Sequence, residues 1–228
     1  MAKVKITKDG PYVVSGKLPL RKEIIGIGNE GEPEEWVRGK DCPSDDTCTL
    51  CRCGQSKNKP FCDGMHIAIG FDGTETASRE NFDKEAKKIV GPGMVLKDNS
   101  PLCAAARFCH RAGGTWELTK HSDNPKSKQI AIEEACNCPS GRLVACDKNG
   151  KAIEPKLEKS IGLVEDPQNK VSGPIWLKGG VPVESSDGSL YEIRNRVTLC
   201  RCGKSRNKPF CDGSHIEEGF DDGDESLD

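Results

Sequence analysis

The chain opens with alternating apolar and polar residues. Residues 3–20 read KVKITKDGPYVVSGKLPL, with a turn-forming Asp-Gly-Pro run at 9–11. Alternation with a period of two is typical of half-buried strands, so this stretch predicts a β-hairpin. Residues 23–28 and 35–38 predict further strands. Residues 26–31, GIGNEG, match the dinucleotide fingerprint G-x-G-x-x-G, but another strand pattern follows where that fingerprint needs a helix, which favours a glycine-rich loop.

The pattern changes after residue 72. A helix is predicted from Ser78 to Ile89, ended by the Gly-Pro-Gly run at 91–93. Residues 148–172 are rich in Lys, Glu and Pro and predict a linker. The chain ends in EEGFDDGDESLD, an acidic stretch for which we expect disorder.

Part of the chain occurs twice. Residues 173–183, GPIWLKGGVPV, match GPYVVSGKLPL at 10–20, and a predicted hairpin around Asp187-Gly188 follows them. Further on, residues 49–67 and 198–216 agree at 16 of 19 positions. The duplication predicts two equivalent modules, the first of them longer between strand and motif.

Each copy carries three cysteines and one histidine in the spacing C-x-C-x8-C-x3-H. The residues are Cys51, Cys53, Cys62 and His66, and Cys200, Cys202, Cys211 and His215. Residues i and i+2 share one face of a strand, and residues i and i+4 share one face of a helix, which we expect Pro60 to begin and Asp63 to cap. Thiolate and imidazole suit an iron–sulfur cluster, zinc or copper, and suit neither calcium nor magnesium. The spacing therefore predicts a metal site in each copy, with an iron–sulfur cluster and zinc as the leading alternatives.

The motif C-x-C-x2-S-x3-P-x-C-D-G-x-H resembles that of the CDGSH iron–sulfur proteins, the mitoNEET group. This resemblance implies a [2Fe–2S] cluster in each copy, with two cysteines on one iron and one cysteine and the histidine on the other. Met65 departs from the family pattern, where a small residue is usual. Single-motif members form two-fold dimers, so two copies in one chain imply an internal pseudo-two-fold pairing and a monomer.

The middle segment has a cysteine pattern of its own. Cys103 and Cys109 are followed by Cys138-Pro139, and Ala106 occupies the place of a middle cysteine. The segment resembles the divergent single-cluster ferredoxin-like domain that accompanies some CDGSH modules. That resemblance implies Cys103, Cys109 and Cys138 as ligands of a third cluster, [3Fe–4S] or [4Fe–4S], with Cys136, Cys146 or His110 as the fourth ligand. The alternative is a small helical insert whose cysteines bind nothing.

Composition limits the other possibilities. Only 34% of the 228 residues are hydrophobic and 5% aromatic, which is little for one core, and metal centres would help small polar modules to stay folded. Thirteen cysteines, an odd number, with four histidines among them favour metal in a reducing compartment over a disulfide framework. Cys42 and Cys48 have no counterparts in the second copy and are expected as small buried apolar residues, with a disulfide or a ligand to another cluster as the alternatives. A net charge of −2 and the absence of a long apolar run argue for no nucleic acid and no membrane span, and we expect a cytoplasmic protein.

Together these observations predict an α+β protein with two β-rich CDGSH modules around a small helical ferredoxin-like insert. The expected divisions are 1–72, 73–147, 148–172, 173–220 and the acidic tail 221–228. The favoured function is electron transfer, with cluster storage and transfer or redox sensing as the alternative, and the partner is a redox protein or an apo-acceptor protein. No activated nucleophile, paired carboxylates or supported nucleotide motif indicates a stand-alone enzyme.

Overall fold

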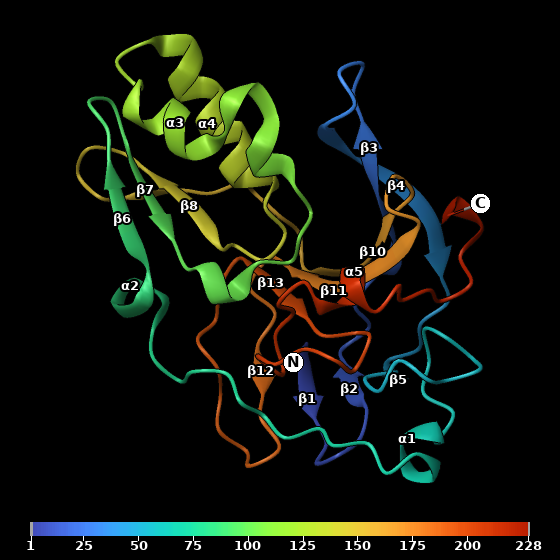
Figure 1. Cartoon of the computed structure of the whole chain (residues 1–228). Helices are drawn as coiled ribbons and strands as arrows, with labels where there is room; N and C mark the ends of the chain where they lie inside the picture. Colours follow the sequence, from blue (N-terminus) through green and yellow to red (C-terminus); the bar gives the residue numbers. More distant parts are fainter. Residues whose placement is uncertain (1, 228) are drawn as a thin grey trace.

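Three β-sheets and a few short helices make up the protein (Figure 1). The computed structural model describes residues 2–227. Within them, no helix is both long enough and apolar enough to span a bilayer. The α+β class expected from the sequence is therefore confirmed.

Two of the sheets contain strands from both halves of the chain. The first has the spatial order β12 (Val183–Glu184), β1 (Lys3–Ile6), β2 (Tyr12–Ser15) and β5 (Thr47–Leu50). The second has the order β13 (Arg196–Leu199), β11 (Val171–Lys178), β10 (Ser160–Asp166), β3 (Leu20–Ile27) and β4 (Pro33–Cys42). The strands expected at 23–28 and 35–38 lie within β3 and β4, and β1 and β2 form the predicted hairpin.

The two halves exchange strands in matching register. β1 runs parallel to β12 with Val4 opposite Val183, and β10 runs parallel to β3 with Ile161 opposite Leu20. The sequence repeat aligns Leu20 with Val183, so each pairing joins a first-half strand to a second-half strand at equivalent positions. Neither half therefore completes its sheet alone.

One apolar core lies between these two sheets and draws on both copies. Tyr12 and Leu50 from the first half are buried with Leu163, Ile175 and Leu199 from the second. Burying one such aliphatic side chain stabilises the fold by about 1.5–3 kcal/mol. The core thus connects the two modules as well as stabilising each one.

The glycine-rich stretch at 26–31 lies at the turn between β3 and β4. The Gly28 amide donates to the Glu32 carbonyl, and β4 follows directly. With a strand where the dinucleotide fingerprint requires a helix, the interpretation of this stretch as a loop is confirmed.

The middle segment forms the third sheet and carries the longest helix. Its strands are β6 (Lys87–Val90), β7 (Val95–Asp98), β8 (Leu143–Cys146) and β9 (Ala152–Ile153), and its helices are α3 (Thr115–Lys120) and α4 (Pro125–Asn137). Ala131 and Ala135 of α4 pack on Met94, Leu96 and Leu143. The expected helical insert is thus a small layer of helix on sheet (Figure 1).

The helix predicted from Ser78 to Ile89 was wrong. Only α2 (Phe82–Glu85) forms there, and β6 begins two residues later. The Gly-Pro-Gly run at 91–93 turns the chain, so that β6 pairs with β7. Strand pairing with a neighbouring segment overrides the local helix propensity.

The predictions of a linker at 148–172 and of a disordered acidic tail were also wrong. Within 148–172, every residue of β10 is buried, and this strand lies in the middle of its sheet. In the tail, Phe220 is buried and the Phe220 carbonyl accepts from the Ser172 amide. Asp222 forms ion pairs with Lys22 and Arg201 there, so the acidic end has cationic partners that its own sequence does not reveal.

Candidate metal centres

The two C-x-C segments begin where β5 and β13 end. The Sγ atoms of Cys51 and Cys53 are 3.8 Å apart, and those of Cys200 and Cys202 are 3.9 Å apart. In the first copy the Cys51 amide donates to the Pro60 carbonyl and the Cys62 amide to the Thr49 carbonyl. These bonds bring the third cysteine beside the first two, and the second copy repeats them between residues 200 and 209 and residues 211 and 198.

The histidine of each motif lies on a one-turn helix. In the first copy this is α1 (Met65–Ala68), in the second α5 (Ser214–Glu217), and a left-handed glycine precedes each of them. The distance from Cys62 Sγ to His66 Nδ1 is 3.4 Å, as is that from Cys211 Sγ to His215 Nδ1. The expected helix through Cys62 and Pro60 was wrong, because the cysteine lies before the first turn. The prediction of Asp63 as the cap was wrong too, because Gly64 is the N-cap of α1; Asp63, one residue earlier, accepts the Met65 amide at 3.0 Å.

These distances fit metal ligands. With metal–sulfur bonds of about 2.3 Å and metal–nitrogen bonds of about 2.1 Å, two thiolates on one tetrahedral ion lie about 3.8 Å apart, and a thiolate and an imidazole about 3.6 Å apart. The observed Cys–Cys and Cys–His pairs are close to both values. Each motif thus offers one two-thiolate pair and one thiolate–imidazole pair.

Main-chain amides and a carboxylate hold the ligand loop in shape. The Gly64 amide donates to Cys62 Sγ at 3.4 Å, and the Gly213 amide donates to Cys211 Sγ at the same distance. Asp63 and Asp212 each accept the amide six residues earlier in the chain, both at 2.8 Å. The duplicated loops therefore keep the same internal hydrogen bonds as well as the same ligands.

The two sites differ in exposure. Cys62 and His66 are half-buried, whereas Cys211 and His215 are 3% and 4% exposed. Burial raises the pKa of Cys211 well above its usual value and lowers the pKa of His215 to about 4. A neutral imidazole is the form that binds metal, and a buried thiol loses its proton when a cation balances the thiolate. The second site is therefore the more enclosed of the two.

The middle segment brings three cysteines to one small cavity. Cys103, Cys109 and Cys138 line it together with Arg142 and the loop between the first two cysteines. Burial, together with the charges of the other two thiols, raises the pKa of Cys109 to about 12, so its thiolate also requires a balancing cation. Three thiols around one cavity are a donor set that suits an iron–sulfur cluster.

None of the three expected fourth ligands lines this cavity. Cys136 Sγ donates to the Ile153 carbonyl, Cys146 is buried with its thiol at the Val144 carbonyl, and His110 is exposed. Ser140 Oγ lies 3.5 Å from Cys138 Sγ, and Arg142 is held by Asp98 at 2.7 Å. Of the residues expected here, the structure gathers the three cysteines alone.

Cys42 and Cys48 lie outside all three sites. Both are half-buried and pack against the main core, and both are free thiols. Burial raises the pKa of each. They are placed as the sequence predicts for small apolar side chains.

Sequence reasoning missed the arginine inside each C-x-C. Arg52 is fully buried, and its guanidinium donates to the Thr7 carbonyl; Arg201 donates to the equivalent Val164 carbonyl, both at 3.2 Å. Arg201 is also paired with Glu165 and Asp222. The signal was present, since both copies read C-R-C.

The two motifs touch through their glycines. A Cβ atom on Gly54 would lie 2.4 Å from the Cys202 carbonyl oxygen, and a Cβ atom on Gly203 would lie 2.5 Å from the Cys53 oxygen. The Tyr12 hydroxyl, from the first half, donates to the Cys200 carbonyl at 2.8 Å. The two glycine contacts place main chain of one motif against main chain of the other, and the Tyr12 side chain adds a bond from the first half to the second motif.

Two soft-ligand sets and a three-cysteine cavity define a protein with several metal centres. The family model for the iron-binding zinc finger CDGSH type matches residues 9–67 and 172–216, and the model for a divergent 4Fe-4S mono-cluster matches residues 89–148. The chain is therefore an iron–sulfur protein in which two segments of the CDGSH type flank a divergent 4Fe-4S segment. Neither the curated proteins nor the solved structures gave a significant match.

Proposed function

We propose that the chain is an electron-transfer protein that holds three iron–sulfur clusters. Cys51, Cys53, Cys62 and His66 would hold a [2Fe–2S] cluster, and Cys200, Cys202, Cys211 and His215 would hold another. Cys103, Cys109 and Cys138 would hold a [3Fe–4S] or [4Fe–4S] cluster. The observation that carries the proposal is the repeated pair of distances, 3.8–3.9 Å between thiols and 3.4 Å from thiol to imidazole.

The ligand set supports redox chemistry. Bound at such a site, a [2Fe–2S] cluster accepts and returns one electron. One imidazole in place of a thiolate removes about one negative charge, which makes reduction easier than in an all-cysteine site. Main-chain amides directed at the ligand sulfurs, such as that of Gly213 on Cys211, also stabilise added negative charge.

The strand exchange supports an internal pseudo-two-fold pairing of the CDGSH modules. Val4 pairs with Val183 as Ile161 pairs with Leu20, and Gly54 meets Cys202 as Gly203 meets Cys53. One chain then supplies the surfaces that two subunits supply in single-motif members. A monomer in solution is the expected state.

The test is a count of iron, sulfide and zinc on the anaerobically purified chain. We expect more than four irons, about seven or eight, with equimolar or near-equimolar sulfide. Replacing Cys103 and Cys138 with serine should remove only the iron beyond four. The matched control is the pair Cys136→Ser and Cys146→Ser, outside the cavity, which should leave the count unchanged. Stoichiometric zinc without sulfide would contradict the proposal.

One observation favours cluster delivery as a second function. At the first motif, His66 is half-buried and its neighbour Ile67 is 78% exposed, as suits contact with an apo-acceptor protein. Delivery predicts that the apo form of a [2Fe–2S] ferredoxin gains a cluster from the first site, and that it does so in only one oxidation state of that site. Electron transfer predicts reversible reduction with all iron retained, so the two functions give different iron counts after one redox cycle.

A further inference from the structure

We propose that the three centres form one electron-transfer series whose order in space differs from their order in the sequence. The middle cysteine site comes first, the second CDGSH site is the internal one, and the first CDGSH site is the outer end. This order rests on the proposed function, since it requires all three sites to be loaded. It is carried by two contacts between ligand-bearing segments.

The first contact joins the middle site to the second CDGSH motif. A Cβ atom on Gly213, between Cys211 and His215, would lie 3.5 Å from both the Cys103 carbonyl oxygen and the Ala105 Cβ. The equivalent Gly64 has nothing within 4 Å. The loop that begins at Cys103 therefore covers the second motif and leaves the first uncovered.

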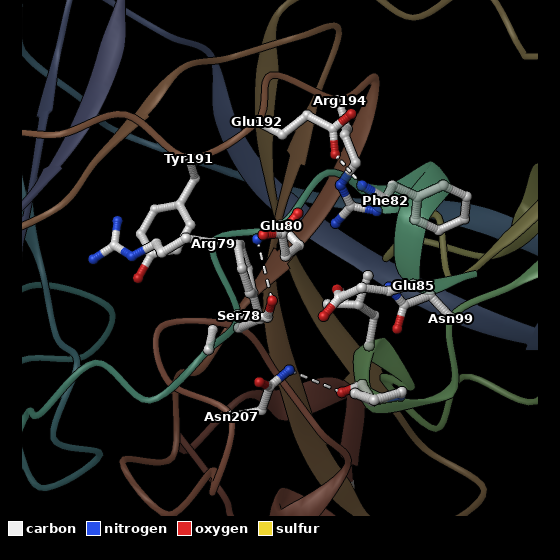
Figure 2. A pocket seen from close by; sticks show the side chains of 14 residues that line it. Ser78, Arg79, Glu80, Phe82, Glu85, Asn99, Tyr191, Glu192, Arg194 and Asn207 are labelled. Atoms are coloured by element: carbon white, nitrogen blue, oxygen red, sulfur yellow. Dashed lines mark hydrogen bonds between the residues drawn. The ribbon is translucent and has the colours of Figure 1, made fainter.

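Two side-chain interactions join the middle segment to the second half of the chain near this contact. Arg107, from the same loop, pairs with the buried Asp166, and Asp166 is one of the charges that act on the His215 ring. On the other side, Asn207 Nδ2 donates to the Pro101 carbonyl at 3.0 Å, at the edge of a cavity of about 190 Å³ (Figure 2). The middle segment is thus bonded to the ligand loop of the second motif through Asn207 and to strand β10 through Asp166.

The second contact joins the two CDGSH motifs. It consists of the reciprocal approach of Gly54 to the Cys202 carbonyl and of Gly203 to the Cys53 carbonyl. Electron transfer slows steeply with distance, so motifs in main-chain contact are favourable neighbours. The second motif alone takes part in both contacts.

The first motif lies at the outside of this arrangement. Among residues 2–227, neither CDGSH motif lines the three-cysteine cavity, and of the two equivalent glycines only Gly213 meets the loop that begins at Cys103. α1, which carries His66, lies at the far end of the molecule from α3 and α4 (Figure 1). An electron from the middle site therefore reaches the first CDGSH site by way of the second.

The electron balance needs one donor and one acceptor outside the chain. One electron enters at the middle site from a reduced low-potential carrier protein, and one leaves from the first CDGSH site to a one-electron acceptor protein. Each internal transfer oxidises one site by one electron and reduces the next by one. No covalent bond forms or breaks.

The experiment measures magnetic coupling between reduced sites in the full chain, reconstituted anaerobically and reduced with dithionite. We expect coupling between the middle and second sites and between the second and first. In Cys211→Ser, which removes a ligand of the second site, both couplings should disappear, and the middle and first sites should show none to each other. The control Cys62→Ser, which empties the first, should keep the coupling of middle to second. Strong middle-to-first coupling in Cys211→Ser would overturn the order.

A second pair of variants tests the contact without removing a ligand. Arg107→Gln removes a positive charge that lies beside the second site and lines the cavity of the middle site, so it should lower the reduction midpoints of these two sites and leave that of the first site unchanged. Arg111→Gln makes the same change in the same segment, but its side chain faces Glu133 and Glu134. This control should leave the reduction midpoint of the second site unchanged. A shift of the first site in Arg107→Gln, or none at the second, would contradict the proposed contact.

Iron and sulfide counts on every sample separate the two possible failures. If the middle site binds no iron while both CDGSH sites are loaded, the three-cluster function fails and the series fails with it. If all three sites are loaded and the middle site couples to the first directly, the function stands and only the order is wrong.

Discussion

Two glycines allow the CDGSH motifs to touch. Gly54 has a φ of +75° and Gly203 a φ of +79°, in the left-handed region that side chains disfavour. The space beside each is also filled, by the carbonyl oxygen of a ligand cysteine in the other motif. Both the backbone conformation and the close approach therefore require glycine at these two positions.

Gly54→Ala should destabilise the protein strongly. A Cβ atom 2.4 Å from the Cys202 oxygen forces one main chain away from the other, in addition to about 1–2 kcal/mol for the left-handed conformation. The control is Gly70→Ala, because Gly70 has a φ of +61° and nothing within 4 Å, so only the conformational cost remains. Thermal unfolding of both variants checks the difference; equal midpoints would show that the motifs do not touch.

Glu134 is a buried carboxyl with few partners. It lies on α4, is fully buried and accepts from the Thr115 hydroxyl at 2.6 Å. Burial raises its pKa from 4.5 to about 7. The folded protein holds this proton more tightly than the unfolded chain does, so stability is lost as the pH rises towards and through 7.

Glu134→Gln should remove that pH dependence. The amide keeps the shape and still accepts from Thr115, so the advantage of the variant over the natural chain should grow from about pH 4.5 to about pH 7, by up to about 3 kcal/mol, and stay constant at higher pH. Thermal midpoints measured across this range check the trend. Glu133→Gln, at a half-exposed neighbour, is the control and should show no such trend. A gap between Glu134→Gln and the natural chain that does not change anywhere in this range would argue against a raised pKa.

At the scale of elements, sequence pattern predicted those parts whose information is local or repeated. The β1–β2 hairpin follows from alternation around a turn, and the ligand sets follow from the duplicated spacing. β6 was mistaken for helix because its strand character comes from pairing with β7. The contact of Cys103 with Gly213 could not be predicted, because it joins segments about a hundred residues apart that share no pattern.

The acidic tail is the element whose role differs most from the sequence expectation. Asp222 has a carboxylate that is 2% exposed and lies between Lys22 and Arg201, with the Ser172 hydroxyl donating to it at 3.0 Å. Arg201 is the residue between Cys200 and Cys202. Through Asp222 the tail therefore helps to hold Arg201, and with it the C-x-C segment of the second site, in position.

Asp222→Asn should cost about 3–5 kcal/mol, the range for removing one partner of a buried ion pair. The loss follows because Arg201 and Lys22 then share only Glu165 and Asp224 nearby. Asp221→Asn changes an exposed neighbour in the same way and should have no measurable effect. Unfolding by denaturant measures the free energy of unfolding of both variants. If Asp222→Asn left it unchanged, the tail would be the solvated segment that the sequence alone predicts.

At the scale of the whole molecule, the duplication has produced two unequal sites. The first is open to solvent at Cys62 and His66, and the second is covered by the middle segment. Equal ligands in unequal surroundings give one chain a site that is partly exposed and another that is buried.

Iron removal should reveal this inequality. With an excess of a strong chelator, iron from the first CDGSH site should leave before iron from the second, giving separate phases in absorbance and in released iron. Cys62→Ser should abolish the early CDGSH phase and Cys211→Ser the late one. Release from both sites at one rate would mean that the covering loop does not protect the second site.

The parallel pairing of β1 with β12 has a consequence during synthesis on the ribosome. Val4 leaves the exit tunnel long before Val183, its partner in the sheet, has been translated. At a rate of about 5–20 residues per second, the first strand waits for roughly ten seconds or more with one edge open. The sheet from β6 to β9 uses only partners from 87–153, so it can close while the rest of the chain is still emerging. The nascent protein therefore passes through a stage in which its middle is folded and its N-terminal edge is exposed to chaperones and to aggregation.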